Sequence, residues 1–143
     1  MLSIKLLGSP QIFDDRDSIR ISRRKSRAFL YYLAASHAPL TREHLLAFFW
    51  PDHERSSGQQ ILRTTLHELR KAIGSVLMTE GETIAFSAGV DIDVRKFEAL
   101  SLIPLTEPTP LTAVLDLYRG DFLENFILPD SSDFENWQTF QAQ

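Results

Sequence analysis

Amide, hydroxyl and cationic side chains recur at helical spacing between residues 56 and 73. At 100° per residue they gather on one side of a helix, opposite a largely apolar stripe that runs from Leu62 to Ile73. The polar side holds Gln60, Arg63, Thr64, His67 and Lys71. These side chains can form hydrogen bonds with base edges in the major groove of double-stranded DNA, which admits one α-helix. The segment is therefore a candidate recognition helix.

A second set of side chains could hold phosphate groups. Most of its members lie near the starts of predicted helices, where unpaired backbone N–H groups also attract anions. The set comprises Arg23, Arg24, Lys25, Arg27, Thr41, Arg42, Ser56 and Arg70. Phosphate contacts fix how a protein lies on a duplex, but they carry no sequence information.

Charge is divided unequally between the two halves of the chain. Residues 1–75 hold twelve Lys/Arg and seven Asp/Glu, a net charge of +5, whereas residues 76–143 hold three and twelve, a net charge of −9. The whole-chain charge of −4 is therefore an average over two unlike parts. A basic half of this kind favours a module that binds a polyanion, joined to an acidic part.

Strands and helices that would position these residues follow from periodicity. Residues 2–6, 11–13 and 18–21 read as short strands separated by turn residues, which predicts a small antiparallel sheet. From about Arg24 the period becomes helical and ends near Ser36. A second helix is expected to begin at Thr41 as its N-cap and to stop at residues 50–52.

The third helix is the candidate recognition helix. It is expected to begin between residues 54 and 56 and to end at Ile73, because Gly74 is a natural terminating residue. Residues 76–79 and 83–86 predict a hairpin with a turn at Glu80 and Gly81, and Asp93 can cap a short helix after it. The fold class is therefore predicted as α+β: a winged helix-turn-helix with an N-terminal antiparallel sheet and a C-terminal wing hairpin.

A proline-rich stretch divides the chain. Residues 102–110 hold three prolines and predict a linker, which leaves residues 1–101 as the winged helix-turn-helix domain and residues 111–143 as a second, helical part. Helices are expected at 111–118 and 131–140. Apolar side chains are too frequent in this part for a free tail, so we expect residues 111–140 to dock on the winged helix or to form a homodimer.

Four segments together resemble one family. They are residues 22–34 (SRRKSRAFLYYLA), 40–46 (LTREHLL) with 50–52 (WPD), 61–71 (ILRTTLHELRK) and 118–137 (YRGDFLENFILPDSSDFENW). The first three are similar to the OmpR-like winged helix of the Streptomyces antibiotic regulatory protein (SARP) type of transcription factor. The last resembles the start of the bacterial transcriptional activation domain, a helical, TPR-like module that follows the winged helix in this group.

The resemblance implies a bacterial transcriptional regulator that binds direct repeats near promoters and contacts RNA polymerase. It also implies that residues 111–143 are the truncated beginning of the activation domain. One feature departs from the pattern: the expected wing tip is acidic, with Glu80 and Glu82, which argues against contacts between the wing and phosphate.

Other kinds of site find little support. The chain has no cysteine, and the spacings of its four histidines do not suit a zinc site, so no metal is expected. The acids near residues 91–93 and 130–135 are better explained as helix caps than as paired catalytic carboxylates. Because no phosphate loop or nucleophile motif occurs, we expect neither an enzyme nor a cofactor.

Cellular location also follows from the sequence pattern. The longest apolar run, residues 45–50, is too short to span a bilayer, and the first residues lack the cationic and apolar regions of a secretory signal. A cytoplasmic protein without membrane contact is expected. Two functions remain open: a sequence-specific regulator that binds DNA, and a winged-helix interaction module that does not bind DNA and works through its acidic C-terminal helices.

Overall fold

The computed structural model describes residues 2–36, 38–87, 89–129 except 102–118, and 131–141. Its elements are β1 (Leu2–Lys5), β2 (Gln11–Asp14), β3 (Asp17–Ser18), α1 (Arg24–Ala35), β4 (Leu40–Thr41), α2 (Arg42–Phe49), α3 (Arg55–Ile73), the 3-10 turn η1 (Gly74–Val76), β5 (Leu77–Glu80), β6 (Thr83–Phe86), β7 (Asp91–Ile92), α4 (Asp93–Ser101) and α6 (Ser132–Gln141). The predicted α+β class is confirmed. The helix expected at 111–118 lies outside the described residues.

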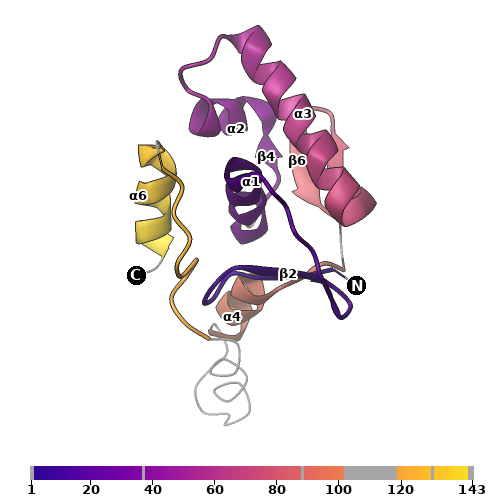
Figure 1. Cartoon of the computed structure of the whole chain (residues 1–143), viewed down its shortest axis with the longest axis vertical. Coiled ribbons are helices and arrows are strands. Elements are labelled where there is room, and N and C mark those ends of the chain that lie inside the picture. Colours follow the sequence, from indigo (N-terminus) through magenta and orange to yellow (C-terminus); the bar gives the residue numbers. More distant parts are fainter. Residues whose placement is uncertain (1, 37, 88, 102–118, 130, 142–143) are drawn as a thin grey trace.

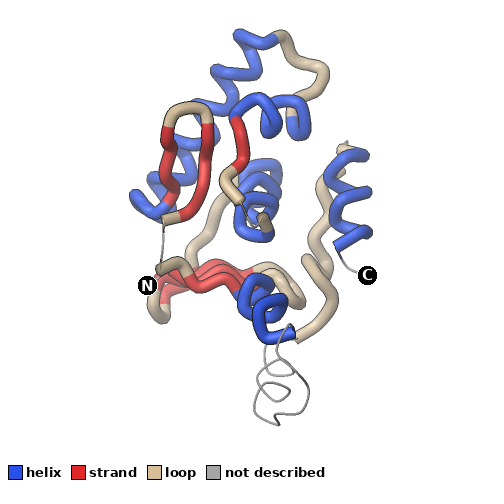
Figure 2. Tube along the Cα trace, turned by 180° about the vertical axis from the view of Figure 1, so that it is seen from behind, coloured by secondary structure: helices blue, strands red, loops and turns tan. Residues whose placement is uncertain are grey.

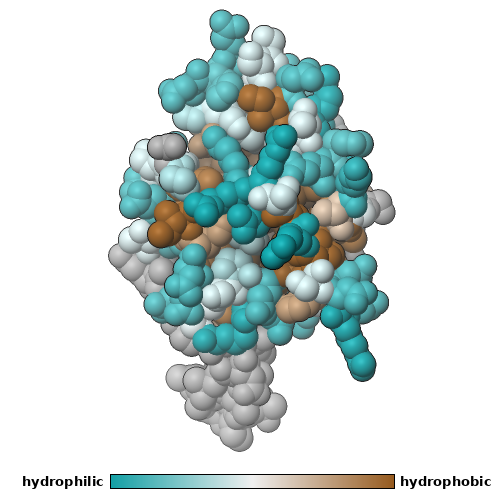
Figure 3. All heavy atoms as spheres, viewed as in Figure 1, coloured by the Kyte–Doolittle hydropathy of each residue, from teal (hydrophilic) through white to brown (hydrophobic). Residues whose placement is uncertain are grey.

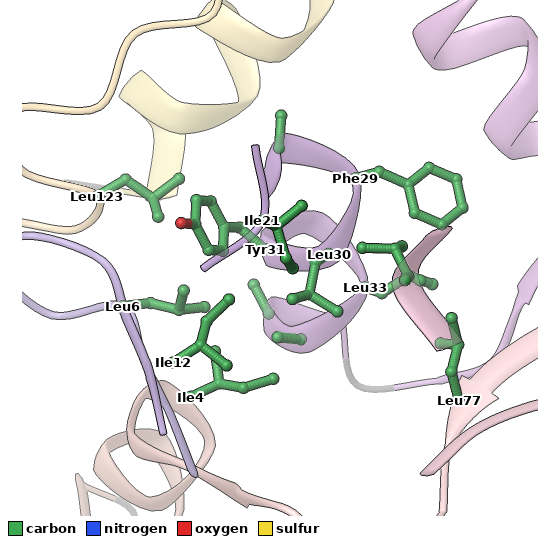
Figure 4. Close-up of a cluster of buried hydrophobic side chains, with 14 of the residues drawn as sticks. Ile4, Leu6, Ile12, Ile21, Phe29, Leu30, Tyr31, Leu33, Leu77 and Leu123 are labelled. Carbon is green, nitrogen blue, oxygen red and sulfur yellow. The ribbon is translucent and has the colours of Figure 1, made fainter. Parts of the chain in front are cut away.

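α1 lies at the centre of the molecule. Figures 1 and 2 show the N-terminal sheet and α4 on one side of it, α2, α3 and the wing on the other, and α6 along its flank. Phe29 and Leu30 of α1 are fully buried because this helix is covered from several directions. In Figure 4, Leu33 lies toward Leu77 of β5, whereas Tyr31 lies on the side of Leu123.

The N-terminal sheet has the strand order β3-β2-β1-β7. β1 and β2 pair antiparallel with Ile4 opposite Ile12, and both side chains are buried against the core. The predicted third strand is shorter than expected: β3 holds only two residues. β7 pairs parallel with β1, so the sheet is mixed rather than wholly antiparallel as expected. Its two residues carry too short a pattern to predict a strand.

The wing is a three-stranded sheet with the order β4-β6-β5. The hairpin of β5 and β6 confirms the prediction, although its turn lies one residue later, at Gly81 and Glu82. Gly81 has a φ of 58°, which glycine adopts without steric cost. β4 was not predicted; it pairs with β6, and the N–H of Arg42 donates to the carbonyl of Glu82 at 2.8 Å. The wing is thereby fastened to the start of α2.

Two side chains of α4 fasten it to the rest of the fold. Asp93, expected as a helix cap, is buried, and its carboxylate accepts hydrogen bonds from the backbone N–H groups of Leu6 (2.7 Å) and Leu7 (3.0 Å). The guanidinium of Arg95 donates to the carbonyls of Leu33, Ala34 and Ser36 at 3.2, 2.9 and 2.7 Å. Carbonyls at a helix C-terminus lack hydrogen-bond partners within the helix. Here the Arg95 guanidinium of α4 is their charged partner.

The described C-terminal residues dock on the winged helix, which is one of the two alternatives that the sequence left open. The N–H of Leu123 donates to the carbonyl of Leu6 and the N–H of Gly8 to that of Asp121, both at 2.8 Å. The buried side chains of Phe122, Leu123, Phe126, Leu128 and Phe134 belong to the same hydrophobic cluster as those of α1 and the sheet. The described residues from 119 onward therefore share a hydrophobic core with α1 and the N-terminal sheet.

α6 packs against α1 and α2 through aromatic rings. The Phe134 ring is fully buried 6.1 Å from that of Phe49, and the Trp137 ring lies 4.8 Å from that of Tyr32. The hydroxyl of Ser131 accepts from the N–H of Phe134 at 3.4 Å, so a serine takes the capping position that the neighbouring acids were expected to occupy.

Candidate nucleic-acid interface

α3 presents a polar face to the outside at one end of the molecule. Its buried face consists of Gly58, Leu62, Thr65, Leu66, Leu69 and Ile73, as periodicity predicted. The five residues proposed to read bases, Gln60, Arg63, Thr64, His67 and Lys71, are all exposed. Figure 3 shows a mostly hydrophilic surface over this end of the molecule. The helix is therefore held by one side and offers hydrogen-bonding groups on the other.

The packing of α2 against α3 forms the helix-turn-helix. The hydroxyl of Thr41 accepts from the N–H of His44 at 3.0 Å, which confirms the predicted N-cap of α2. Gly58 allows α3 to approach α2 closely, because a Cβ added there would lie 3.2 Å from Cδ2 of Leu46. The two helices border a cleft of about 500 Å³ that is also lined by Arg42, Arg63 and Glu82.

The single acid near the outer face of α3 is held away from that face. Glu68 accepts a hydrogen bond from the hydroxyl of Ser26 at 3.0 Å, and Nε of Arg23 lies 3.9 Å from the same oxygen. Both partners belong to the start of α1 or the residue before it. The carboxylate is therefore directed toward α1 and partly neutralised. The outer face of α3 keeps a net positive charge.

The proposed phosphate-binding residues fall into two groups. Arg24, Thr41 and Ser56 are exposed, and Arg42 is half-buried at the start of α2. Arg23 is also exposed, although it lies 3.9 Å from the Glu68 carboxylate, so these five residues can still be reached by a ligand. The other three residues already contact protein groups: Lys25 lies over the Trp50 ring at 5.5 Å, Arg27 over the Phe126 ring at 5.9 Å, and Arg70 on the wing strand β5.

Arg70 joins the recognition helix to the wing. Its Nε donates to the carbonyl of Leu77 and an Nη atom to the hydroxyl of Thr79, both at 3.2 Å. These bonds hold the guanidinium beside β5, where its charge adds to the basic surface while its geometry is set by the hairpin. Arg55 was not predicted as a site residue, yet it is exposed in the first turn of α3 and lines the cleft with Arg63. Arg55 lies within the range where the sequence left the start of the helix open, so periodicity did not assign it to either face.

The tip of the wing is acidic, as the sequence indicated. Glu80 and Glu82 are both exposed, and Glu82 lines the cleft beside Arg42 and Arg63. A phosphate group that approached the cleft would meet the Glu82 carboxylate as well as the guanidinium groups. The wing therefore reduces the positive potential of this end instead of adding to it.

Two further features, a metal-binding cluster and a membrane-spanning helix, are not found in the described part of the chain. No group of three or more His, Asp or Glu side chains lies together in a metal-binding arrangement among those residues. Within the same residues, no helix is both long enough and apolar enough to span a bilayer.

Comparison with known proteins identifies the fold by structure and not by sequence. No protein-family model matches the chain, and no curated protein sequence matches it. Among solved structures, Mycobacterium tuberculosis EmbR, determined in complex with a low affinity phosphopeptide, superposes with a TM-score of 0.77 at 22% sequence identity. The match covers 97% of this chain and 41% of the EmbR chain. The chain therefore has the winged-helix fold that is found in EmbR and spans less than half of that protein.

Proposed function

We propose that this chain is the DNA-binding part of a bacterial transcriptional regulator of the SARP type and that α3 enters the major groove. The single observation that carries the proposal is the exposed face of α3, where Gln60, Arg63, Thr64, His67 and Lys71 face outward together. The shared fold with EmbR and the sequence resemblance to SARP-type regulators support the same role. DNA binding of this kind needs neither a catalytic group nor a cofactor.

In this proposal the side chains divide by task. Arg63 and Lys71 pair with guanine or phosphate, Gln60 with adenine, and Thr64 contacts a thymine methyl group. His67 donates a hydrogen bond to either a base or a phosphate. The N-terminus of α2, with Thr41 and Arg42, and the exposed arginines before and at the start of α1 hold phosphates beside the groove.

The resemblance extends the proposal beyond the helix. A SARP-type regulator would act in the cytoplasm, bind direct repeats near promoters and contact RNA polymerase. Residues 1–101 would serve as the DNA-binding domain and residues 111–143 as the beginning of the activation domain, joined by the linker at 102–110. Because most described apolar side chains of residues 111–140 are buried in the chain's own core, a homodimer through this part would use those that stay exposed, such as Ile127 and Phe140.

Salt dependence of duplex binding tests the proposal. We expect the chain to bind random double-stranded DNA weakly, with an affinity that falls steeply as salt rises, because bound cations are released when Lys and Arg neutralise phosphates. Binding to the DNA upstream of its own gene should be tighter and should give a footprint. If the folded chain binds neither duplex at low salt, the proposal is wrong. That result would favour the alternative, a winged-helix interaction module that does not bind DNA.

A further inference from the structure

A second groove runs along α3, apart from the cleft that this helix forms with α2. The chain between β3 and α1 passes there beside the C-terminal half of α3 (Figure 1). The groove has a volume of about 170 Å³ and is lined by Arg20, Ile21, Ser22, Glu68, Lys71 and Ala72. Arg20, Ser22 and Lys71 are exposed, whereas Ile21 is buried in the core. The buried isoleucine therefore holds the segment in place while its polar side chains face solvent.

The second groove and the cleft of α2 border opposite edges of the outer face of α3. At about 100° per residue, Glu68 and Ala72 lie about 80° and 120° to one side of Gln60. Gln59 and Arg63, which line the cleft of α2, lie about 100° and 60° to its other side. A helix in the major groove has a DNA backbone on each side. Each edge of α3 would therefore face a different strand of the duplex.

The second groove offers two cations that are not engaged elsewhere. Neither Arg20 nor Lys71 forms an ion pair or a side-chain hydrogen bond within the described residues. The acid of this groove is already engaged, because Glu68 accepts from the hydroxyl of Ser26 at 3.0 Å and lies 3.9 Å from Nε of Arg23. The groove therefore presents a net positive charge to an approaching anion.

We propose that Arg20 and Lys71 bind phosphates of the DNA backbone on the side of α3 opposite to α2. The inference rests on the proposed function, since it requires α3 to lie in the major groove. On the α2 side, the carboxylate of Glu82 at the wing tip opposes phosphate binding. The segment before α1 thus supplies cations to the duplex that the acidic wing tip does not, and Arg20 joins the residues that bind DNA.

Binding of the whole chain to two random duplexes of unrelated sequence, followed by fluorescence anisotropy over a series of salt concentrations, tests the inference. Arg20→Gln and Lys71→Gln should each lower the affinity for both duplexes by about three- to tenfold at low salt. Each should also reduce the slope of log affinity against log salt by about one, because one phosphate contact is lost. Arg20→Lys should keep the slope, since a lysine also neutralises a phosphate as a point charge.

Two further variants locate the contact. Lys96→Gln makes the same change in net charge on α4 and should leave the slope unchanged. Arg20→Gln combined with Arg42→Ala should reduce the slope by about two, because residues at opposite edges of α3 meet different phosphates and their losses add.

The outcomes separate this inference from the proposed function. An unchanged slope in Arg20→Gln, an equal loss in Lys96→Gln, or a combined loss no larger than that of Arg42→Ala alone would overturn the inference. In each of these cases the unaltered chain still binds DNA, and the proposed function stands. If the unaltered chain binds neither duplex at low salt, both are wrong.

Discussion

Single residues on α3 carry the proposed reading of DNA, and Arg63 is the most informative of them. It projects from the middle of the exposed face, one turn from both Gln60 and His67. Arg63→Ala should cost about 1–3 kcal/mol on the cognate site and relax specificity at one or two base pairs. Affinities for cognate and scrambled duplexes at two salt concentrations measure both effects.

Arg42 provides the matching control at the start of α2. Arg42→Ala should weaken binding to all duplexes alike and reduce the slope of log affinity against log salt by about one, because a phosphate contact carries no sequence information. Equal losses on cognate and scrambled DNA in Arg63→Ala would make Arg63 a phosphate contact as well. No loss in Arg63→Ala would remove α3 as the reading helix.

The acidic wing tip gives a prediction of the opposite sign. Glu82 lines the cleft beside Arg42 and Arg63, so its carboxylate should repel an approaching phosphate. Glu82→Gln should therefore raise duplex affinity by a factor of a few at low salt, and the gain should shrink as salt screens the repulsion. Glu135→Gln on α6 makes the same change in net charge away from α3. Equal gains in both variants would assign the effect to net charge and not to the wing.

Which residues could be predicted depends on how local their roles are. The exposed face of α3 and the cap at Thr41 follow from spacing within one helix, and the structure places them as expected. The ties of Glu68 to Ser26 and of Asp93 to Leu6 join residues 42 and 87 positions apart, and no local pattern encodes them. Arg27 was grouped with the phosphate-binding arginines because it is one of several basic residues at the start of α1. In the structure its guanidinium lies over the Phe126 ring instead.

At the scale of elements, helices and the wing hairpin were predictable, and short strands were not. α1, α2 and α3 have enough turns for periodicity and end at recognisable residues such as Gly74. β4 and β7 have two residues each, and their positions are set by partners in β6 and β1. The joining of elements therefore depends on contacts between segments that are distant in the sequence.

Arg95 is the clearest such contact between two helices. It donates to three carbonyls at the C-terminal end of α1, which has no basic residue in its own last turn. Arg95→Ala should lower the free energy of unfolding by about 1–3 kcal/mol, because these carbonyls would lose a charged partner. Urea unfolding monitored by circular dichroism measures the change.

The neighbouring Lys96 serves as its control. Lys96 forms an ion pair with Asp91 at 2.7 Å, but its side chain is 56% exposed. Exposed ion pairs contribute little, so Lys96→Ala should cost less than about 1 kcal/mol. Equal losses in both variants would show that Arg95 acts as a surface charge and not as a cap of α1.

At the scale of the whole molecule, the docked C-terminal residues join α1 and α2 through aromatic packing. Rings of α1 and α2, including Tyr32 and Phe49, contact Phe134 and Trp137 of α6 within one cluster. The sequence indicated that this part would be buried, since it is too apolar for a free tail. It could not indicate the partner surface, because docking and dimerisation bury the same side chains.

Phe134 tests this docking. It is fully buried, so Phe134→Ala should destabilise the chain by about 3–5 kcal/mol through lost burial and the cavity that remains. Phe140→Ala on the same helix, where the ring is 72% exposed, should change stability by less than about 0.5 kcal/mol. Hydrogen exchange should show α6 and the facing amides of α2 losing protection together in Phe134→Ala, because the two helices share this contact. If α6 is unprotected in the unaltered chain, or if α2 keeps its protection when α6 is lost, the helix-turn-helix is stable without the C-terminal segment and the docking contributes nothing to it.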